Sequence, residues 1–271
     1  AYGYSKSTYI SLKDSSVVTT GNNSAGTAVS ARAMMKVENS TVSTTGDSSP
    51  AIMIADGGGI LIADGGSFTT SGAMSQGIYS KGDVTVTNAS VNALNAKAAV
   101  LKGNNTITLS GTILEGKETA DTIPYNIVLF SDEKDIGTMG TQHFDVRGGS
   151  LISHKGGMFY VTATHGKISL NGTAITMDDP AANLITVAGN DGANGWGTPG
   201  RNGGHVELVA DNQVLTGNIS VDSISNINMT LKNNSTFNGI ISIVPNAEGG
   251  EKYKTNADVF IAAGSTWNLT G

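Results

Sequence analysis

The chain lacks several features that would assign it to a functional class. It has no cysteine among its 271 residues, which excludes disulfides and thiolate metal ligands. No apolar run approaches the ~20 residues of a membrane-spanning helix, so no span is predicted. Charged residues make up only 14 % of the chain, the net charge is −6, and lysine and arginine form no cluster. Because nucleic-acid binding requires a basic stripe, no nucleic-acid partner is predicted.

Glycine, by contrast, is abundant at 36 residues, and serine, threonine and asparagine are frequent. Low charge with much glycine, threonine and valine favours short strands and tight turns over helices. Residues 83–91 illustrate the pattern, because Val84 and Val86 alternate with threonines and a small polar turn precedes Val91. Alternate residues of a strand point to opposite faces. The three valines are therefore predicted to face a core, and the two threonines and Asn88 to lie at the surface or in the turn.

The same outline recurs along the whole chain. The apolar residue after each turn marks the register, at Val17, Val42, Phe68, Val91, Ile113, Leu151, Ala174, Val214, Phe237 and Trp267. Most marks follow one another at a near-constant spacing, and the steps from Ile113 to Leu151 and from Ala174 to Val214 are the longest. A regular strand-and-turn period of this kind, within the repeat lengths of solenoids, is typical of that architecture. The predicted fold is all-β, a single parallel β-helix domain over residues 1–271 with about ten coils.

Two insertions account for the longest steps. The first, around residues 115–140, is acidic and surrounds an apolar stretch at 126–130. The second, residues 189–204, is rich in glycine and has no composition that could form a core. The stretch 126–130 is predicted to be a buried strand of the coil. The second insertion is predicted to lie outside the coil, as functional or tolerated loops do. The chain stops inside a repeat, and we expect it to be part of a longer protein.

The C-terminal repeats carry three recognisable motifs, which are Leu-x-Gly-Asn-Ile-x-Val-Asp, Leu-x-Asn-Asn-Ser-x-Phe-x-Gly and Gly-Ser-Thr-Trp-x-Leu-Thr-Gly. In these motifs the chain resembles the passenger domains of autotransporter adhesins and other bacterial surface β-helix repeat proteins. The resemblance implies a right-handed parallel β-helix on a bacterial cell surface, outside the cell. It further implies a non-catalytic adhesin or stalk segment without a cofactor. Its partner would be a host surface protein, a glycan or another copy of itself.

Threonine pairs recur on three consecutive coils and are predicted to stack at one corner; they are Thr19, Thr20, Thr44, Thr45, Thr69 and Thr70. A regular row of hydroxyls suits ice binding or packing against a neighbouring molecule. The alternative is a turn built from small strand-forming residues. Asparagines also recur near the turns, where they tolerate left-handed conformations and form side-chain ladders; they are Asn39, Asn88, Asn104, Asn171, Asn233, Asn234 and Asn268.

Histidines are the only candidate metal ligands besides carboxylates. His143, His154 and His165 follow one another at equal intervals of about half a coil, and His205 lies further on. Alternate members would then face opposite sides of the coil. A metal site needs three or four ligands that converge on one point, and the pattern predicts none.

An enzyme is the main alternative, because polysaccharide lyases and hydrolases also use parallel β-helices. Their chemistry needs clustered carboxylates or an acidic Ca²⁺ site beside a basic residue. The candidates are the Asp145 and Arg147 pair, the adjacent Asp178 and Asp179, and a group of Asp191, Arg201 and His205 around the glycine-rich loop. Trp196 in the same loop is placed to stack on a sugar ring or to cap the coil. Trp196, Arg201, Asp191 and His205 are the candidate binding residues.

Overall fold

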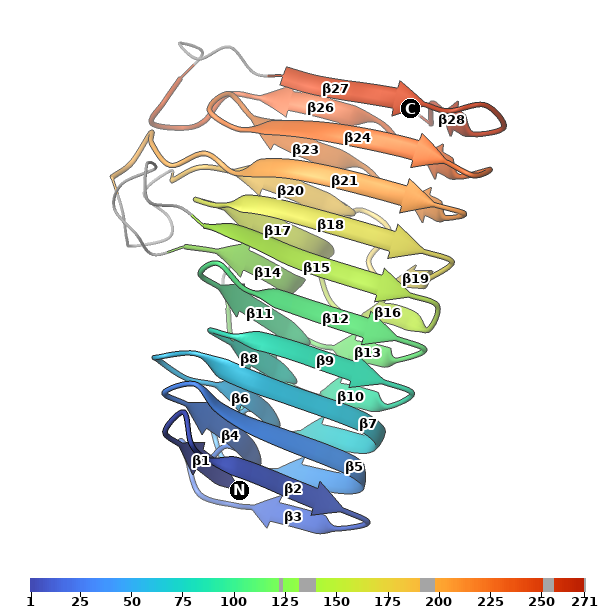
Figure 1. The fold of residues 1–271 in the computed structure, drawn as a ribbon. Helices are drawn as coiled ribbons and strands as arrows, with labels where there is room; N and C mark the ends of the chain where they lie inside the picture. Colours follow the sequence, from blue (N-terminus) through green and yellow to red (C-terminus); the bar gives the residue numbers. More distant parts are fainter. Residues whose placement is uncertain (122–123, 132–139, 191–197, 251–255, 271) are drawn as a thin grey trace.

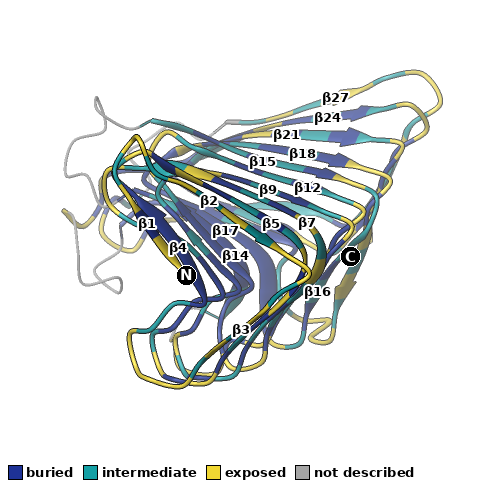
Figure 2. Cartoon of the chain, turned by 60° about the horizontal axis from the view of Figure 1, so that its bottom comes forward, coloured by how far each residue is buried: buried dark blue, intermediate teal, exposed yellow. Residues whose placement is uncertain are grey.

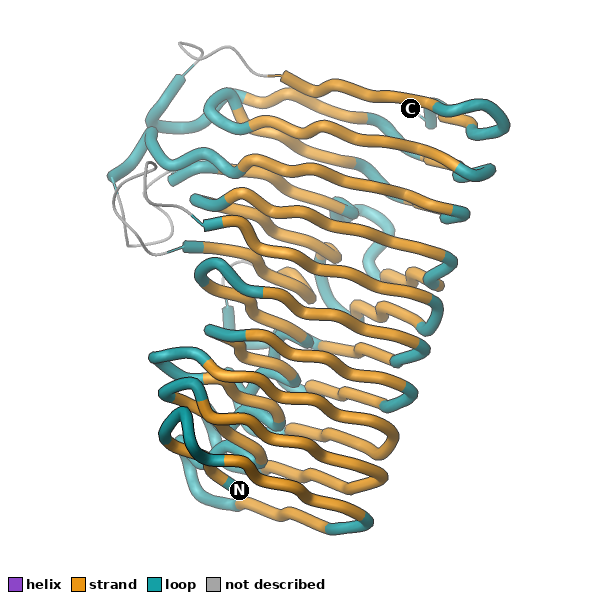
Figure 3. Tube along the Cα trace, in the orientation of Figure 1, coloured by secondary structure: helices purple, strands orange, loops and turns teal. Residues whose placement is uncertain are grey.

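The computed structural model describes residues 1–121, 124–131, 140–190, 198–250 and 256–270. Within these ranges every regular element is a β-strand, and no helix is present (Figure 3). The described residues thus include no helix that could cross a membrane. The chain visits three stacks of parallel strands in a repeating order, from β1 to β3 at one end to β27 and β28 at the other (Figure 1). We call one pass through the three stacks a circuit.

The first stack is a ten-stranded sheet in which every strand pairs in parallel with the strand of the next circuit. Its strands are β1 (Tyr2–Tyr4), β4 (Thr27–Ser30), β6 (Ile52–Ile54), β8 (Ile78–Ser80), β11 (Ala99–Lys102), β14 (Tyr125–Phe130), β17 (Gly157–Thr162), β20 (Ile185–Ala188), β23 (Ile219–Asp222) and β26 (Ile241–Val244). The apolar stretch inside the first insertion is therefore a regular member of this sheet.

A fifteen-stranded sheet contains the second stack and most of the third, because β5 and β7 run through both. The second stack consists of β2 (Tyr9–Lys13), β5 (Ala33–Thr44), β7 (Gly59–Thr70), β9 (Asp83–Thr87), β12 (Thr106–Ser110), β15 (Thr141–Arg147), β18 (His165–Asn171), β21 (His205–Asp211), β24 (Asn226–Lys232) and β27 (Asn256–Ile261). The third consists of β3 (Ser16–Thr19), the later halves of β5 and β7, β10 (Ser90–Ala93), β13 (Ile113–Gly116), β16 (Ser150–Ser153) and β19 (Ala174–Met177). A separate three-stranded sheet of β22 (Val214–Thr216), β25 (Thr236–Asn238) and β28 (Thr266–Asn268) lies beyond β19.

The corner between the second and third stacks repeats one backbone conformation. The residue that follows the second-stack segment has a positive φ in successive circuits, and the residues at this position are Asp14, Asn39, Gly65, Asn88, Gly111, Gly148, Gly172, Asn212 and Asn233. Only glycine, asparagine and aspartate adopt this left-handed conformation at little cost. The prediction that asparagines occupy left-handed turns is confirmed at Asn39, Asn88, Asn233 and Asn234.

One apolar core runs between the stacks through all the circuits. Its largest fully buried side chains include Phe68, Phe144, Phe159 and Phe237. The valines of residues 83–91 are buried and the two threonines between them are partly exposed, as the alternation predicts (Figure 2). A smaller cluster of Val100, Val128 and Tyr160 lies apart from this core, on the opposite face of the first stack.

Three of the predicted register marks are wrong by one residue. Strand pairing aligns Val91 with Leu114, Leu114 with Leu151 and Leu151 with Ile175. Ile113 and Val214 are exposed, whereas their neighbours Leu114 and Leu215 are buried. Ala174 is likewise displaced by Ile175. In each case two apolar residues are adjacent, and a shift of one residue exchanges the inner and outer faces of a strand.

Candidate functional site

The predicted threonine row lies at the end of the third stack. Thr19, Thr44 and Thr70 are in register, whereas Thr69 pairs with Ser43. The third threonine pair is thus shifted by one residue from the predicted row. The shift arises because the partly buried Val17 and the buried Val42 and Phe68 set the register, and the third pair starts directly after Phe68.

The aligned threonine hydroxyls are used inside the protein. Each donates to the carbonyl oxygen five residues later, from Thr19 to Ser24 (2.7 Å), Thr44 to Ser49 (2.6 Å) and Thr70 to Ser75 (2.5 Å). The serines continue the contact between circuits, because the backbone N–H of Ser24 donates to Ser49 Oγ and that of Ser49 to Ser75 Oγ, each over 2.9 Å. Thr20 and Thr45 remain exposed. The aligned threonines therefore bond within their own circuits, the serines join neighbouring circuits, and only part of the row's hydroxyls is exposed to solvent.

His154 bridges carboxylates from the circuits on either side. Its Nε2 lies 2.5 Å from Glu115 Oε1, and its Nδ1 lies 2.7 Å from Asp178 Oδ2. The contacts with Asp178 and Glu115 raise the pKa of His154, because a neighbouring carboxylate favours the charged imidazolium. This arrangement, the His154 bridge, links three consecutive circuits at the third stack.

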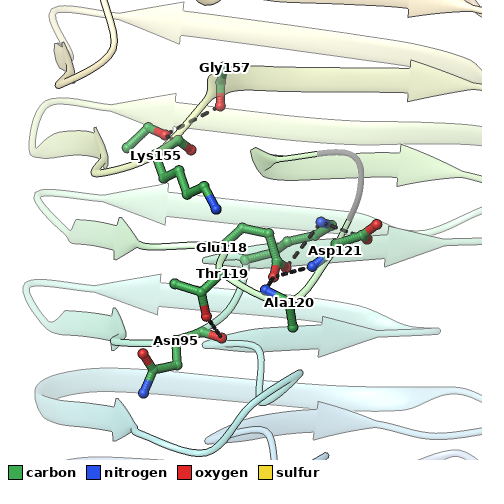
Figure 4. A network of polar contacts seen from close by, with 9 residues as sticks. Asn95, Glu118, Thr119, Ala120, Asp121, Lys155 and Gly157 are labelled. Atoms are coloured by element: carbon green, nitrogen blue, oxygen red, sulfur yellow. Dashed lines mark hydrogen bonds and ion pairs between the residues drawn. The ribbon is translucent and has the colours of Figure 1, made fainter.

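A buried ion pair fixes the start of the first insertion. Lys97 Nζ lies 3.1 Å from Glu118 Oε2 and 2.9 Å from Asp121 Oδ2, and Lys97 and Glu118 are both buried. Glu118 Oε1 also accepts the backbone N–H groups of Ala120 and Asp121 at 2.7 and 3.0 Å (Figure 4). Each oxygen of Glu118 has a partner, so the buried carboxylate is satisfied within the protein. The cluster therefore holds the start of the insertion in place and is not suited to bind a ligand.

A polar pocket lies on the outer face of the second stack. It has a volume of about 310 Å³ and is lined by Thr141, His165, Gly166, Lys167, His205, Val206, Glu207, Asn226 and Asn228. These residues come from β15, β18, β21 and β24, which are neighbours in the sheet. The first insertion rejoins the sheet at Thr141 and the second at His205. The two insertions thus both end at residues that line one pocket.

Strand pairing arranges the polar side chains in two columns. One column contains Thr141, His165, His205 and Asn226 in register. The other contains Lys167, Glu207 and Asn228, two residues further along the same strands. Side chains two residues apart on a strand face the same side, so both columns point outward from the core.

Contacts within the pocket hold its side chains in place. The rings of His165 and His205 are stacked, with centroids 4.8 Å apart and an interplanar angle of 21°. Asn226 Nδ2 lies 2.6 Å from His205 Nδ1, and Lys167 Nζ lies 3.1 Å from Glu207 Oε2. Burial lowers the pKa of His205 and outweighs the contact with Asn226, which raises it, while the neighbouring His165 lowers it further. With the amide of Asn226 donating, the neutral His205 ring carries its proton on Nε2.

The other predicted site residues that the structure describes do not gather around this pocket. Asp145 and Arg147 lie on β15 opposite Ser169 and Asn171. Asp178 contacts His154, and Asp179 Oδ1 accepts the backbone N–H of Ala181 over 3.0 Å. Arg201 is exposed and is not among the lining residues. Asp191 and Trp196 lie outside the described residues.

The histidines divide between two places, as their spacing suggests. His143 and His165 lie on adjacent strands of the second stack, and His154 lies beside the third. No group of three histidines or carboxylates suited to a metal ion occurs in the described part of the chain. Of the two predicted binding residues that the structure describes, His205 lines the pocket and Arg201 does not. The other polar residues of the pocket come from strands that looked purely structural.

Comparison with family models, curated proteins and solved structures found no match to this chain.

Proposed function

We propose that this chain is a right-handed parallel β-helix of about ten coils that acts as a non-catalytic binding segment on a bacterial cell surface. The proposed ligand is a host surface protein, a glycan or a second copy of the chain, bound through the outer faces and loops. The observation that carries the proposal is the convergence of both insertions on one preorganised polar pocket above a continuous core. The proposed location is supported by the resemblance of the C-terminal motifs to those of bacterial surface β-helix repeat proteins.

The partners of the acidic residues favour binding over catalysis. Glycoside hydrolysis needs two carboxyl groups that face one bond. Here Glu115 and Asp178 are both engaged by His154, and Glu207 is engaged by Lys167. Each of these carboxylates already has a charged or polar partner on a neighbouring circuit, which suits a rigid surface better than a general acid and base.

One observation favours the enzyme alternative. His205 has a lowered pKa and lies beside Lys167 and Glu207 in the pocket, and a neutral imidazole can accept a proton. A β-helix polysaccharide lyase or hydrolase would release product from acidic polysaccharides and lose that activity in His205→Ala. Binding without product release would support the non-catalytic proposal.

The proposal is tested by measuring binding of the whole chain to immobilised glycans, matrix proteins and itself. The second loop can be removed cleanly, because Gly200 N–H donates to Asn190 O over 2.7 Å and Asn190 N–H donates to Arg201 O over 2.9 Å. A two-residue turn that joins Asn190 to Gly200 should therefore close the gap.

If the loop contributes contacts, this deletion weakens binding while the melting temperature stays unchanged. A matched control replaces the exposed Thr20 and Thr45 by alanine at the opposite end of the molecule. Unchanged binding after the deletion would remove the loop from the proposal, and absence of binding to every partner class would overturn the proposal itself.

A further inference from the structure

The pocket on β15, β18, β21 and β24 presents a fixed array of hydrogen-bonding groups. Residues in register on neighbouring strands are about 4.8 Å apart, and outward residues along one strand are about 7 Å apart. The two columns therefore form a grid, with Gly166 and Val206 between them. Beneath the grid lie Ile168, Leu208 and Ile227, which are fully buried. The grid thus rests on a packed core and changes little when a ligand enters.

The groups of the grid include donors and acceptors with no excess charge. Lys167 and Glu207 neutralise each other, and the lowered pKa of His205 favours its neutral ring. Asn226, Asn228 and Thr141 each offer both a donor and an acceptor. A phosphate or sulfate would meet the carboxylate of Glu207, and a cation would meet Lys167. Sugar hydroxyls, which donate and accept at the same time, match this set.

Two other ligand classes do not fit the histidine pair. A metal ion would need both imidazole lone pairs to point at one place, but lone pairs lie in the ring planes, and these planes are stacked at 21° with centroids 4.8 Å apart. A planar aromatic ligand would need the space between the rings, and this centroid distance is too short for insertion. The pocket is also at the lower end of the volume range of small-molecule sites, which suits one or two sugar rings.

We propose that this pocket binds a neutral carbohydrate, with Glu207, Asn228 and the paired His165 and His205 rings hydrogen-bonding its hydroxyls. The inference rests on the proposed function, because it names the ligand class that a surface binding segment would take. It goes further in assigning the contact to strand residues, so that the loops are not required for it.

The test is a titration of the whole chain followed by the imidazole resonances of its histidines. The probes are neutral oligosaccharides ending in glucose, galactose or N-acetylglucosamine, with hexuronate oligosaccharides and inorganic sulfate as charged arms. At about 10 mM probe, even a Kd of about 1 mM gives nearly full occupancy. A neutral sugar is expected to shift the His165 and His205 signals, and His154, at the third stack, serves as the internal control.

Two variants assign the contacts. Glu207→Gln and His165→Ala are each expected to weaken sugar binding by about tenfold, since a hydrogen bond to a charged or well-ordered group is lost. The matched control is Asp211→Asn, which removes a carboxylate from the same strand, where Asp211 pairs with Lys232 at 3.3 Å. The control should bind as the wild type does.

The outcomes separate this inference from the proposed function. Carbohydrate binding that leaves His165 and His205 unshifted, or that survives both variants, would overturn the pocket assignment while the binding function stands. Binding only to hexuronates or sulfate would overturn the neutral-sugar assignment. Binding only to proteins or to itself would overturn the inference, and no binding at all would overturn both.

Discussion

The first circuits and the circuits around β18, β21 and β24 use stacked polar side chains in opposite ways. In the first circuits, Ser49 and Ser75 are buried and bond the backbone of the neighbouring circuit. In the later circuits, His165, His205 and Asn226 stack on the outer face and contact one another. Both columns follow from the same parallel register. The face on which a polar column lies therefore decides whether it joins circuits or is available to a ligand.

The apolar core beneath both regions should be equally sensitive to the loss of a large side chain. Of the predictions that test the comparison, this one has the largest expected effect. Phe68 in the first region and Phe144 in the second are fully buried. Replacing either by alanine is expected to lower the free energy of unfolding by about 3–5 kcal/mol. Urea unfolding followed by circular dichroism measures the loss, with Tyr9→Ala, at an exposed position, as the control.

The two phenylalanine variants also test whether the circuits unfold together. A single transition that shifts equally in both variants is expected if the core is one cooperative unit. A variant that leaves half of the chain resistant to proteolysis would show instead that neighbouring circuits are only weakly coupled, and the two regions would then be separate in stability as well as in role.

The buried serine column gives the next largest effect. Ser49 Oγ accepts the N–H of Ser24 over 2.9 Å and lies 3.0 Å from the carbonyl oxygen of Gly21. Ser49→Ala leaves the partly buried N–H of Ser24 without this partner and should cost about 1–3 kcal/mol. Thr45→Ala, at an exposed position nearby, should change stability by less than about 0.5 kcal/mol. Equal losses in both variants, measured by urea unfolding, would contradict the assigned role of the column.

The sequence predicts much of this fold, because alternation within strands and a near-constant spacing are both visible in it. The left-handed corners were also foreseeable from asparagine and glycine, as at Asn88 and Gly111. The predicted register is wrong where Ile113 precedes Leu114, since either residue could fill a core position. Only packing against Val91 and Leu151 separates them.

The pocket was only partly foreseeable. His205 was a candidate because it follows the glycine-rich insertion, but its partners were not. Because that insertion lengthens the chain between His165 and His205, their spacing in the sequence does not reveal that the two histidines are in register. Aligning Ile168 with Leu208, both apolar positions of the repeat, places one histidine above the other. The ring stacking and the contact with Asn226 depend on side-chain geometry that no spacing encodes.

The stability contributed by His154 and His205 should depend on pH, whereas that of the serine column should not. The raised pKa of His154 means that the His154 bridge stabilises the fold fully below the unfolded value of about 6.5. This stability is lost as the pH rises through the folded pKa. Because the groups are partly exposed, the difference between wild type and His154→Asn should stay below about 1 kcal/mol.

Urea unfolding of the wild type and of His154→Asn, from below about pH 6.5 to above the folded pKa of His154, measures this difference. NMR titration of Asp178→Asn adds a direct check, since loss of that carboxylate should lower the pKa of His154. An unchanged pKa in Asp178→Asn would show that the bridge does not stabilise the imidazolium.

His205 should behave with the opposite sign and the smallest effect. Its lowered pKa means that the folded protein binds fewer protons than the unfolded chain between the two pKa values. The stability it contributes is therefore present above about pH 6.5 and is lost as the pH falls through the folded pKa. Relative to His205→Gln, the wild type should lose less than about 1 kcal/mol on acidification, since the side chain is only partly buried. A wild type that instead gains stability on acidification would mean that His205 accepts a proton readily in the folded protein, and the pocket would then be cationic rather than neutral at acidic pH.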